Sequence, residues 1–125
     1  MITGASRGIG AATARLLAQR GASVAITYNE QGDRAQSIVD ELRSEGGEAV
    51  AIRLDIAEAA SVAVAMEEFS GHFGALDILV NNAGTFGARA FDAIDFDFYA
   101  QQFNTNVWGT IQVTQAALVL FPDRG

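Results

Sequence analysis

Residues 3–10, with the sequence TGASRGIG, combine three glycines and an arginine at the start of a predicted helix. Gly4, Gly8 and Gly10 have no Cβ, so the chain can turn tightly there and a ligand can approach its backbone. The first N–H groups of a helix, together with its dipole, favour an anion such as a pyrophosphate. The spacing G-x-x-x-G-x-G differs from the common dinucleotide fingerprint, and without lysine it is no phosphate loop. By themselves the glycines are explained equally well by an ordinary turn between a strand and a helix as by a turn that binds a pyrophosphate.

Two later groups of polar residues follow apolar runs of the chain. Asp55 comes after the run at residues 49–52, and the sequence NNAG of residues 81–84 comes after the run at residues 76–80. Open α/β sheets bind ligands at the carboxyl ends of their strands, which makes both groups candidates for a site. Taken alone, Asp55 is also explained as a helix cap, and residues 81–84 as an asparagine-rich turn.

The elements that must position these residues are strands and helices in alternation. Continuous apolar runs at residues 24–27, 49–52 and 76–80 predict strands that are buried on both faces. Apolar residues between the runs recur with helical spacing. The first set is Ala35, Ile38, Val39 and Leu42, and the second is Val62, Ala65, Met66, Phe69 and Phe73. Gly21 and the Gly46-Gly47 pair lie where helix C-caps are expected.

A longer helix is predicted over residues 96–120. One face of this helix carries Phe103, Val107, Ile111, Thr114 and Leu118. Alternating strands and helices favour parallel βαβ units, whose right-handed crossovers put helices on both faces of the sheet. The sequence therefore predicts an α/β fold, a doubly wound parallel sheet in a single domain.

Composition narrows the possible functions. The chain has 125 residues, with 8 basic residues, all arginine, against 15 acidic ones, and its net charge of −7 argues against a nucleic-acid surface. The absence of cysteine excludes disulfides and thiolate metal sites, and one histidine excludes a paired-histidine site, so no metal is expected. No segment has the roughly 18–20 apolar residues of a membrane span, and the amino terminus lacks a secretory signal pattern. These features favour a soluble, cytoplasmic protein with no membrane partner.

Four of these motifs, taken in order, resemble the short-chain dehydrogenase/reductase family. They are TGASRGIG at residues 3–10, Asp55-Ile56 after the third strand of the family, NNAG at residues 81–84 after the fourth, and Asn106 in the run NTNV of residues 104–107. Each stands at the expected end of its predicted element. The resemblance covers essentially all 125 residues.

The resemblance implies a role for each matching residue. The cofactor-binding residues that it implies are Gly4, Ser6, Arg7, Gly8, Ile9, Gly10, Tyr28, Asn29, Asp55, Ile56, Asn82, Ala83 and Gly84. Asp55 would accept a hydrogen bond from the adenine amino group, and Asn81 would tie backbone segments together. Asn106 would act in catalysis, where its carbonyl holds a water of the proton relay. The alternative for Asn106 is a polar residue on a solvated helix surface.

The expected cofactor is NADP, with NAD as the alternative. In members that prefer NAD an acidic residue takes the place of Tyr28, and in members that prefer NADP a basic residue at the place of Arg7 pairs with the 2′-phosphate. Asn29 departs from the arginine often found there. Glu30 could imitate the NAD pattern but is expected in the loop beyond the ribose.

The catalytic residues of the family are absent from this sequence. The family uses a serine on its fifth strand and a Tyr-x-x-x-Lys pair on the next helix, whereas this chain has no lysine and only Tyr28 and Tyr99. The family also has a first strand before Thr3, which would pair with the second and fourth strands. Here only Met1 and Ile2 precede Thr3, so two ladders of backbone groups should be exposed. The sequence is interpreted as a cofactor-binding, Rossmann-like domain over residues 1–125, truncated at both ends.

Two classes of function are consistent with these observations. The first is an oxidoreductase that moves hydride between NADP(H) and an alcohol/carbonyl substrate. Arg7, Tyr28 and the Gly46-Gly47 turn add a resemblance to the 3-oxoacyl-carrier-protein reductases, and the chain alone is expected to be inactive. The alternative is a non-catalytic nucleotide-binding or interaction module; a methyltransferase would explain the glycine turn but not residues 81–84. The resemblance also implies that a longer parent protein is a homo-oligomer, most simply a tetramer, because the family often pairs subunits through the long helix. Here that helix is apolar on more than one face.

Overall fold

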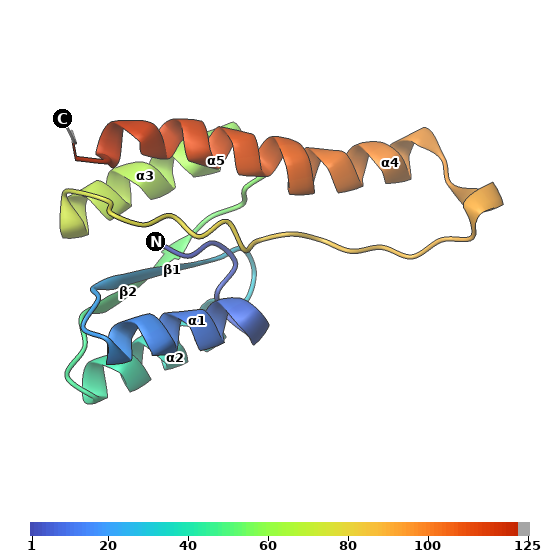
Figure 1. The fold of residues 1–125 in the computed structure, drawn as a ribbon. Coiled ribbons are helices and arrows are strands. Elements are labelled where there is room, and N and C mark those ends of the chain that lie inside the picture. Colours follow the sequence, from blue (N-terminus) through green and yellow to red (C-terminus); the bar gives the residue numbers. More distant parts are fainter. Residues whose placement is uncertain (123–125) are drawn as a thin grey trace.

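The computed structural model describes residues 1–122 (Figure 1). Its helices and strands are α1 (Gly8–Gln19), β1 (Val24–Tyr28), α2 (Gly32–Ser44), β2 (Ala49–Arg53), α3 (Ala59–Phe73), α4 (Phe96–Phe103) and α5 (Thr110–Ala117). The two strands are parallel, with Val24 opposite Ala49 and Tyr28 opposite Arg53. The alternation of strand and helix predicted from the sequence is confirmed over this part of the chain.

Helices cover both faces of the strands. In Figure 1, α1 and α2 lie on one side of β1 and β2, and α3 and α5 lie on the other. Each face has its own apolar cluster: Ile26 and Leu42 belong to the cluster under α1 and α2, and Ile52 and Phe69 to the cluster under α3 and α5. The doubly wound arrangement is therefore confirmed.

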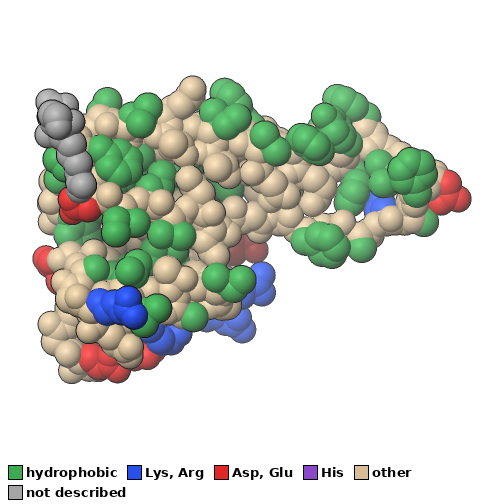
Figure 2. Space-filling view, viewed as in Figure 1, with side chains coloured by type: hydrophobic (Ala, Val, Ile, Leu, Met, Phe, Trp, Pro, Cys, Tyr) green, Lys and Arg blue, Asp and Glu red, His purple; other side chains and the backbone are tan. Residues whose placement is uncertain are grey.

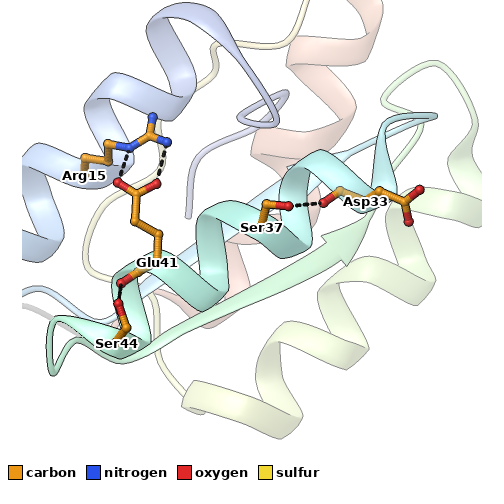
Figure 3. Close-up of polar contacts among 5 residues, drawn as sticks. All are labelled: Arg15, Asp33, Ser37, Glu41 and Ser44. Carbon is orange, nitrogen blue, oxygen red and sulfur yellow. Dashed lines mark hydrogen bonds and ion pairs between the residues drawn. The ribbon is translucent and has the colours of Figure 1, made fainter.

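A bidentate ion pair joins the two helices of the first face (Figure 3). Arg15 on α1 donates to both carboxylate oxygens of Glu41 on α2, at 2.8 and 2.7 Å. Hydrogen bonding from the Arg15 guanidinium holds the pKa of the Glu41 carboxyl below its usual value. Both side chains are about two-fifths exposed, so water screens the pair and it adds little to stability. Its main effect is to fix how α1 lies against α2.

The first residues of the chain lie in the middle of the sheet. Ile2 forms parallel bridges with Ile26 of β1 on one side and with Val80 on the other. The predicted pairing of a first strand with two neighbours is thus confirmed. The strand predicted at residues 76–80 is wrong as a full strand, because only Val80 takes part in a bridge. Its neighbour offers only the short stretch at Met1–Thr3 for pairing, which is too little to form a ladder of five residues.

The long helix predicted at residues 96–120 is present but is not uniform. A π-helical segment, Asn104–Gly109, separates α4 from α5, and a short 3-10 turn, Leu118–Leu120, follows α5. The predicted apolar face does not form the buried face of this helix: Phe103 is 50% exposed and Leu118 is 61% exposed. Instead Gly109, Gln112, Val113 and Ala117 are buried. The wider turns of the π segment change the register of the side chains, so a constant helical period does not locate the buried face.

Residues 84–95 and α4 project away from the two layers (Figure 1). Hydrophobic side chains cover much of this projection (Figure 2), including Phe86 and Phe91, which are 90% and 93% exposed. Arg89 pairs with Asp95 at 3.0 Å and its guanidinium lies 4.7 Å from the ring centre of Phe98.

Among residues 1–122, no helix combines the length and the apolar character that crossing a bilayer requires.

Candidate functional site

The glycine turn before α1 is packed tightly against the loop that follows Val80. A Cβ on Gly4, whose φ is +62°, would lie 2.8 Å from the Cα atom of Ala83. A Cβ on Gly10 would lie 2.6 Å from the side-chain nitrogen of Asn82 and 2.8 Å from the Cα atom of Ala5. The two glycines therefore let two backbone segments, distant in sequence, approach each other more closely than any larger residue would permit.

The same turn also rests on the end of β1. The N–H of Gly4 donates to the Thr27 hydroxyl at 3.2 Å, and the N–H of Ala5 donates to the Thr27 carbonyl at 2.8 Å. Thr27 is fully buried, so both contacts are protected from water. The carboxyl end of β1 and the glycine turn thus form one rigid corner.

The first turn of α1 has no capping side chain. Arg7 occupies the N-cap position, where it makes no side-chain cap, and the first turn contains no acidic residue. By contrast, Asp95 caps α4 by accepting from the N–H of Phe98 at 2.8 Å. Arg7, Gly8 and Ile9 are exposed, and a Cβ on Gly8 would meet no atom within 4 Å. The start of α1 therefore offers N–H groups, a positive dipole end and an arginine to an external anion.

Thr3 and Asn82 connect the glycine turn to residues 81–84. The Thr3 hydroxyl accepts from the N–H groups of Asn82 and Ala83, at 3.0 and 2.9 Å. In return, the amide of Asn82 donates to the carbonyls of Thr3 and Gly4, at 2.9 and 3.0 Å. The structure thus corrects the expectation that Asn81 ties backbone segments together: Asn82 does so, whereas the Asn81 amide donates to Thr114 on α5 at 3.0 Å.

Asp55 forms a second polar corner at the end of β2. Its carboxylate accepts from the N–H of Ala57 at 2.9 Å and from the side chain of Asn29 at 3.1 Å. The backbone N–H of Asp55 donates to the Ser61 hydroxyl at 2.9 Å. The residue does stabilise the turn before α3, although the N-cap of α3 is Glu58. Asn29 is thereby fixed beside Asp55.

α5 and the π segment hold the turn at Ile56 in place. The side chain of Gln112, which is buried, donates to the Ile56 carbonyl. A Cβ on Gly109 would lie 2.9 Å from the same carbonyl oxygen, so the helix can come this close only with glycine at that position. Nothing in the sequence pattern pointed to Gln112, because a lone glutamine in an apolar helix usually faces solvent.

Asn106, in the π segment, binds the backbone of the loop after residue 84. Its side-chain oxygen accepts from the N–H of Thr85 at 2.7 Å, and its side-chain nitrogen donates to the Thr85 carbonyl at 2.8 Å. The backbone carbonyl of Asn106 accepts from the Thr110 hydroxyl at 3.0 Å. A Cβ on Gly84 would lie 2.9 Å from the Asn106 side-chain oxygen. Both ends of the Asn106 amide are therefore used to fix residues 84–85.

An open cavity of about 780 Å³ lies beside the end of β1. Tyr28 and Asn29 line it, together with Glu30 from the following loop and two arginines, Arg34 and Arg53. The Arg53 guanidinium donates to the Asn29 carbonyl at 3.4 Å. Tyr28, Asn29 and Glu30 could be considered from the sequence, whereas the two arginines could not, because neither lies in a motif.

Most of the expected site residues therefore fall at one end of the sheet. The glycine turn meets Asn82 and Ala83 directly, and Asn29 meets Asp55 directly. Asn106 reaches this edge through Thr85, while Arg7 makes no ion pair with any of residues 1–122. Five further residues position the site without a role expected from the sequence: Thr3, Thr27, Ser61, Gly109 and Gln112.

Comparison with known proteins gives consistent results. A family model described as short chain dehydrogenase matches residues 1–125. A hydroxynaphthalene reductase-like protein of Metarhizium guizhouense is 41% identical over 125 residues, which are all of this chain and 47% of that protein. An oxidoreductase of Methylorubrum extorquens is 38% identical over 117 residues, 94% of this chain and 47% of that protein. The chain spans about half the length of the curated relatives that it matches.

Solved structures agree with the fold. A short chain dehydrogenase from Burkholderia cenocepacia, in complex with NADP, superposes with a TM-score of 0.91 at 43% identity. The match covers 98% of this chain and 50% of that one. A blue fluorescent protein from a metagenomic library, in complex with NADPH, gives a TM-score of 0.89 at 41% identity, over 97% of this chain and 50% of that one.

Proposed function

Because this chain belongs to the short-chain dehydrogenase family, we propose that it binds NADP(H) at the carboxyl edge of its sheet. The observation that carries the proposal is the uncapped start of α1, where Arg7 stands exposed beside the glycine turn. A pyrophosphate fits there because it would accept from the first N–H groups of the helix. Two relatives of known structure hold NADP or NADPH, which supports the same class of cofactor.

The remaining cofactor contacts are proposed at the glycine turn and at the Asp55 turn. We propose that Ser6, Gly8 and Ile9 contact the pyrophosphate, while the backbone of Ala83 and Gly84 lines the opposite side of the site. Asp55 and Ile56 would hold the adenine, and their turn is already fixed by other contacts. Asn82 would act mainly by holding the glycine turn, since its amide donates to the Thr3 and Gly4 carbonyls.

The preference for the 2′-phosphate is assigned to Arg7. Tyr28 and Asn29 carry no charge, so neither opposes a phosphate at the end of β1. Glu30, which would support NAD instead, lines the cavity beside them. The cation at Arg7 and the absence of an acidic residue at position 28 favour NADP.

The longer protein is proposed to transfer hydride between NADP(H) and an alcohol/carbonyl substrate. When bound, the nicotinamide supplies or accepts the hydride, and the chain described here binds and orients the nucleotide. Asn106 is proposed to serve the proton relay through its backbone carbonyl, because both ends of its side-chain amide are occupied by Thr85. The Thr110 hydroxyl donates to the same carbonyl.

The substrate class is proposed only as a small carbonyl compound. Arg7, Tyr28 and the Gly46-Gly47 turn support a finer likeness to the 3-oxoacyl-carrier-protein reductases. A relative with the whole chain aligned is named hydroxynaphthalene reductase-like, which supports an aromatic carbonyl compound instead. Both are reductions of a carbonyl group.

Binding without turnover is the second candidate function, for this chain alone. Its sequence contains no lysine, so it has no Tyr-x-x-x-Lys pair to exchange the substrate proton. We expect a homogeneous sample of the chain to bind NADPH and to leave it unoxidised with a panel of carbonyl compounds. Oxidation of NADPH by such a sample would reject this assignment.

Arg7→Ala tests the proposed cofactor preference. A charge-assisted contact is worth about 1.5–3 kcal/mol, so calorimetry should find NADPH bound about ten- to a hundredfold more weakly. NADH lacks the phosphate and should bind with little change. Arg20→Ala, at the other end of α1, is the matched control and should alter neither affinity. Equal losses for the two nucleotides would reject selection of NADP by Arg7.

A homo-oligomeric parent protein is also proposed. Trp108, Ile111 and Leu118 remain 49%, 42% and 61% exposed on the long helix, which supports an interface between copies. Sedimentation of a longer protein containing this chain should give a tetramer at micromolar concentration. A monomer would contradict the proposal.

A further inference from the structure

The open cavity beside the end of β1 contains basic side chains to which no role has yet been given. Arg34 and Arg53 both line this cavity, and both are exposed. Glu30 and Asp33 line it as well, but neither arginine forms an ion pair among residues 1–122. The chain has 15 acidic residues against 8 basic ones, so acidic partners are plentiful. Two arginines without such a partner, in one cavity, are available to an anionic ligand.

Of these two arginines, Arg53 is the one that is anchored to the backbone. Its Nε atom donates to the Asn29 carbonyl at 3.4 Å. The terminal nitrogens of its guanidinium make no hydrogen bond with any of residues 1–122. Asn29 is itself held in place, because its side chain donates to the Asp55 carboxylate at 3.1 Å. Arg53 therefore presents free N–H donors from a defined position.

Arg53 lies on the face of the sheet that α1 and α2 cover. Side chains alternate along a strand, and Ala51, two residues before Arg53, packs against the apolar cluster under α1 and α2. Tyr28 lies opposite Arg53 in the ladder and packs against the same cluster. The Arg53 side chain is therefore on the same face as the start of α1, where the pyrophosphate is proposed to bind.

Arg7 and Arg53 come from the two segments that flank β1. Ile2 pairs with Ile26 on one side of β1, and β2 pairs with β1 on the other side. The glycine turn that carries Arg7 follows directly after Ile2 and Thr3 and rests on Thr27. Arg53 is the last residue of β2. This arrangement allows one guanidinium from each side to contact an anion at the end of β1.

The adenosine ribose of the proposed cofactor is expected at the same place. With the pyrophosphate at the start of α1 and the adenine at Asp55, the ribose between them passes the end of β1. Asn29, in the loop after β1, carries no charge, and the next residue, Glu30, repels a phosphate. This loop therefore supplies no cation at residues 29–30, whereas Arg53 stands beside Asn29. A guanidinium can offer two parallel N–H groups to the oxygens of a phosphate.

We propose that Arg53, from β2, supplies a second cation for the 2′-phosphate of NADP(H), opposite Arg7. The inference rests on the proposed function, because it assigns a further residue of the same nucleotide site. A phosphate monoester carries nearly two negative charges at neutral pH, so two cations match its charge. Arg34, which has no anchoring contact, adds only to the positive potential of the cavity.

Adenosine 2′,5′-bisphosphate and 5′-AMP measure the contact, because they differ only in the 2′-phosphate. Calorimetry of the chain at pH 7.5 gives both affinities, and their ratio reports the 2′-phosphate alone. In Arg53→Gln this ratio should fall about three- to tenfold, while the affinity for 5′-AMP stays within about twofold. Glutamine keeps a donor for the Asn29 carbonyl. An unchanged ratio, or equal losses for the two ligands, would overturn the proposal.

Two matched variants separate this contact from the effect of net charge. Arg34→Gln removes a cation from the same cavity, and Arg20→Gln removes an exposed cation at the other end of α1. We expect the ratio to change by less than about twofold in the first variant and not at all in the second. A loss in either variant as large as that in Arg53→Gln would show that net charge sets the ratio, and would overturn the assignment to Arg53.

Arg7→Ala, measured with the same two ligands, distinguishes this inference from the proposed function. The ratio should depend on Arg7 and on Arg53. A ratio that depends on Arg7 alone would reject the role of Arg53 and leave the nucleotide site in place. If neither ligand binds to a chain that is folded by circular dichroism, the nucleotide site is rejected and this inference with it.

Discussion

At the scale of single residues, Asn82 joins the two backbone segments on which the proposed site depends. Its amide donates to two carbonyls of the glycine turn, and its own N–H is bound by Thr3. The neighbouring Asn81 makes one contact, with Thr114. The two asparagines are adjacent and chemically identical, but the geometry gives them different tasks.

Asn82→Ala should therefore destabilise the chain much more than Asn81→Ala. The first variant leaves two partly buried carbonyls without their donor, which costs about 1–3 kcal/mol. The second removes an exposed contact and should cost less than about 1 kcal/mol. Urea unfolding measures both. A larger loss for Asn81→Ala would contradict the assignment.

Gly8 and Gly10 offer a second matched pair at this scale. A Cβ at position 10 would lie 2.8 Å from the backbone of Ala5, whereas at position 8 it would meet open space but keep a φ of +58°. We expect Gly10→Ala to cost roughly 2–3 kcal/mol through overpacking, and Gly8→Ala about 1–2 kcal/mol through backbone strain. Denaturant midpoints at equal slope measure the difference, and equal costs would show that the glycine turn can relax.

At the scale of elements, the helices and the buried strands were predictable, since their patterns are local. The sets around Ile38 and Phe69 mark α2 and α3, and Gly21 and Gly46 end α1 and α2 with φ values of +86° and +87°. The π segment was not predictable. Its wider turns use the same residue types as the neighbouring α-helices, so no composition signal marks it. Residues 76–80 were predicted as a strand because they form an apolar run. The run carries no information on how much of the neighbouring segment, Met1–Thr3, is available for pairing.

Some residues of the candidate site could likewise be predicted from the sequence, and others could not. The glycine turn, Asp55 and Asn106 could be found because they stand in motifs. Gln112 could not, since its role depends on the approach of α5 to Ile56, which only the packing of the helix determines. Thr3 stands in the glycine motif, but its role could not be predicted, because it acts across a separation of 79 residues.

Gln112→Leu tests the contact between α5 and the Ile56 turn. Leucine fills the volume but leaves the Ile56 carbonyl without its donor, which should cost about 1–3 kcal/mol in urea unfolding. If Asp55 and Ile56 hold the adenine, 5′-AMP should also bind more weakly. Gln115→Leu, exposed on the same helix, is the control and should change neither quantity. Retained stability and AMP affinity in Gln112→Leu would show that the turn is fixed without α5.

At the scale of the whole molecule, stability should depend on pH when the chain is prepared with a free, buried amine at Met1. Its pKa is lowered from 8.0 to about 6 in the folded chain, mainly by burial. Between these two values the unfolded chain binds more protons, so the free energy of unfolding should rise as pH increases from 6 to 8. The gain between pH 6 and pH 8 should be about 2 kcal/mol.

Urea unfolding at pH 6 and pH 8 measures this gain. A chain acetylated at its amino terminus has no ionisable amine there and is the matched control. The pH-dependent part should disappear on acetylation. An identical slope in both chains would assign the dependence to other groups.

The central position of Met1–Thr3 has a consequence for the order of events during synthesis. Met1 pairs with Ile78 and Thr3 with Asn82, across separations of 77 and 79 residues. Ile2 also pairs with β1, which is made early, but the partners of Met1–Thr3 at residues 78–82 exist only after nearly two-thirds of the described chain has been made. α1, β1, α2 and β2 can assemble earlier, since their contacts are closer in sequence. A nucleotide bound as proposed would therefore assist only a late stage of folding, because Asn82 and Ala83 join the glycine turn only then.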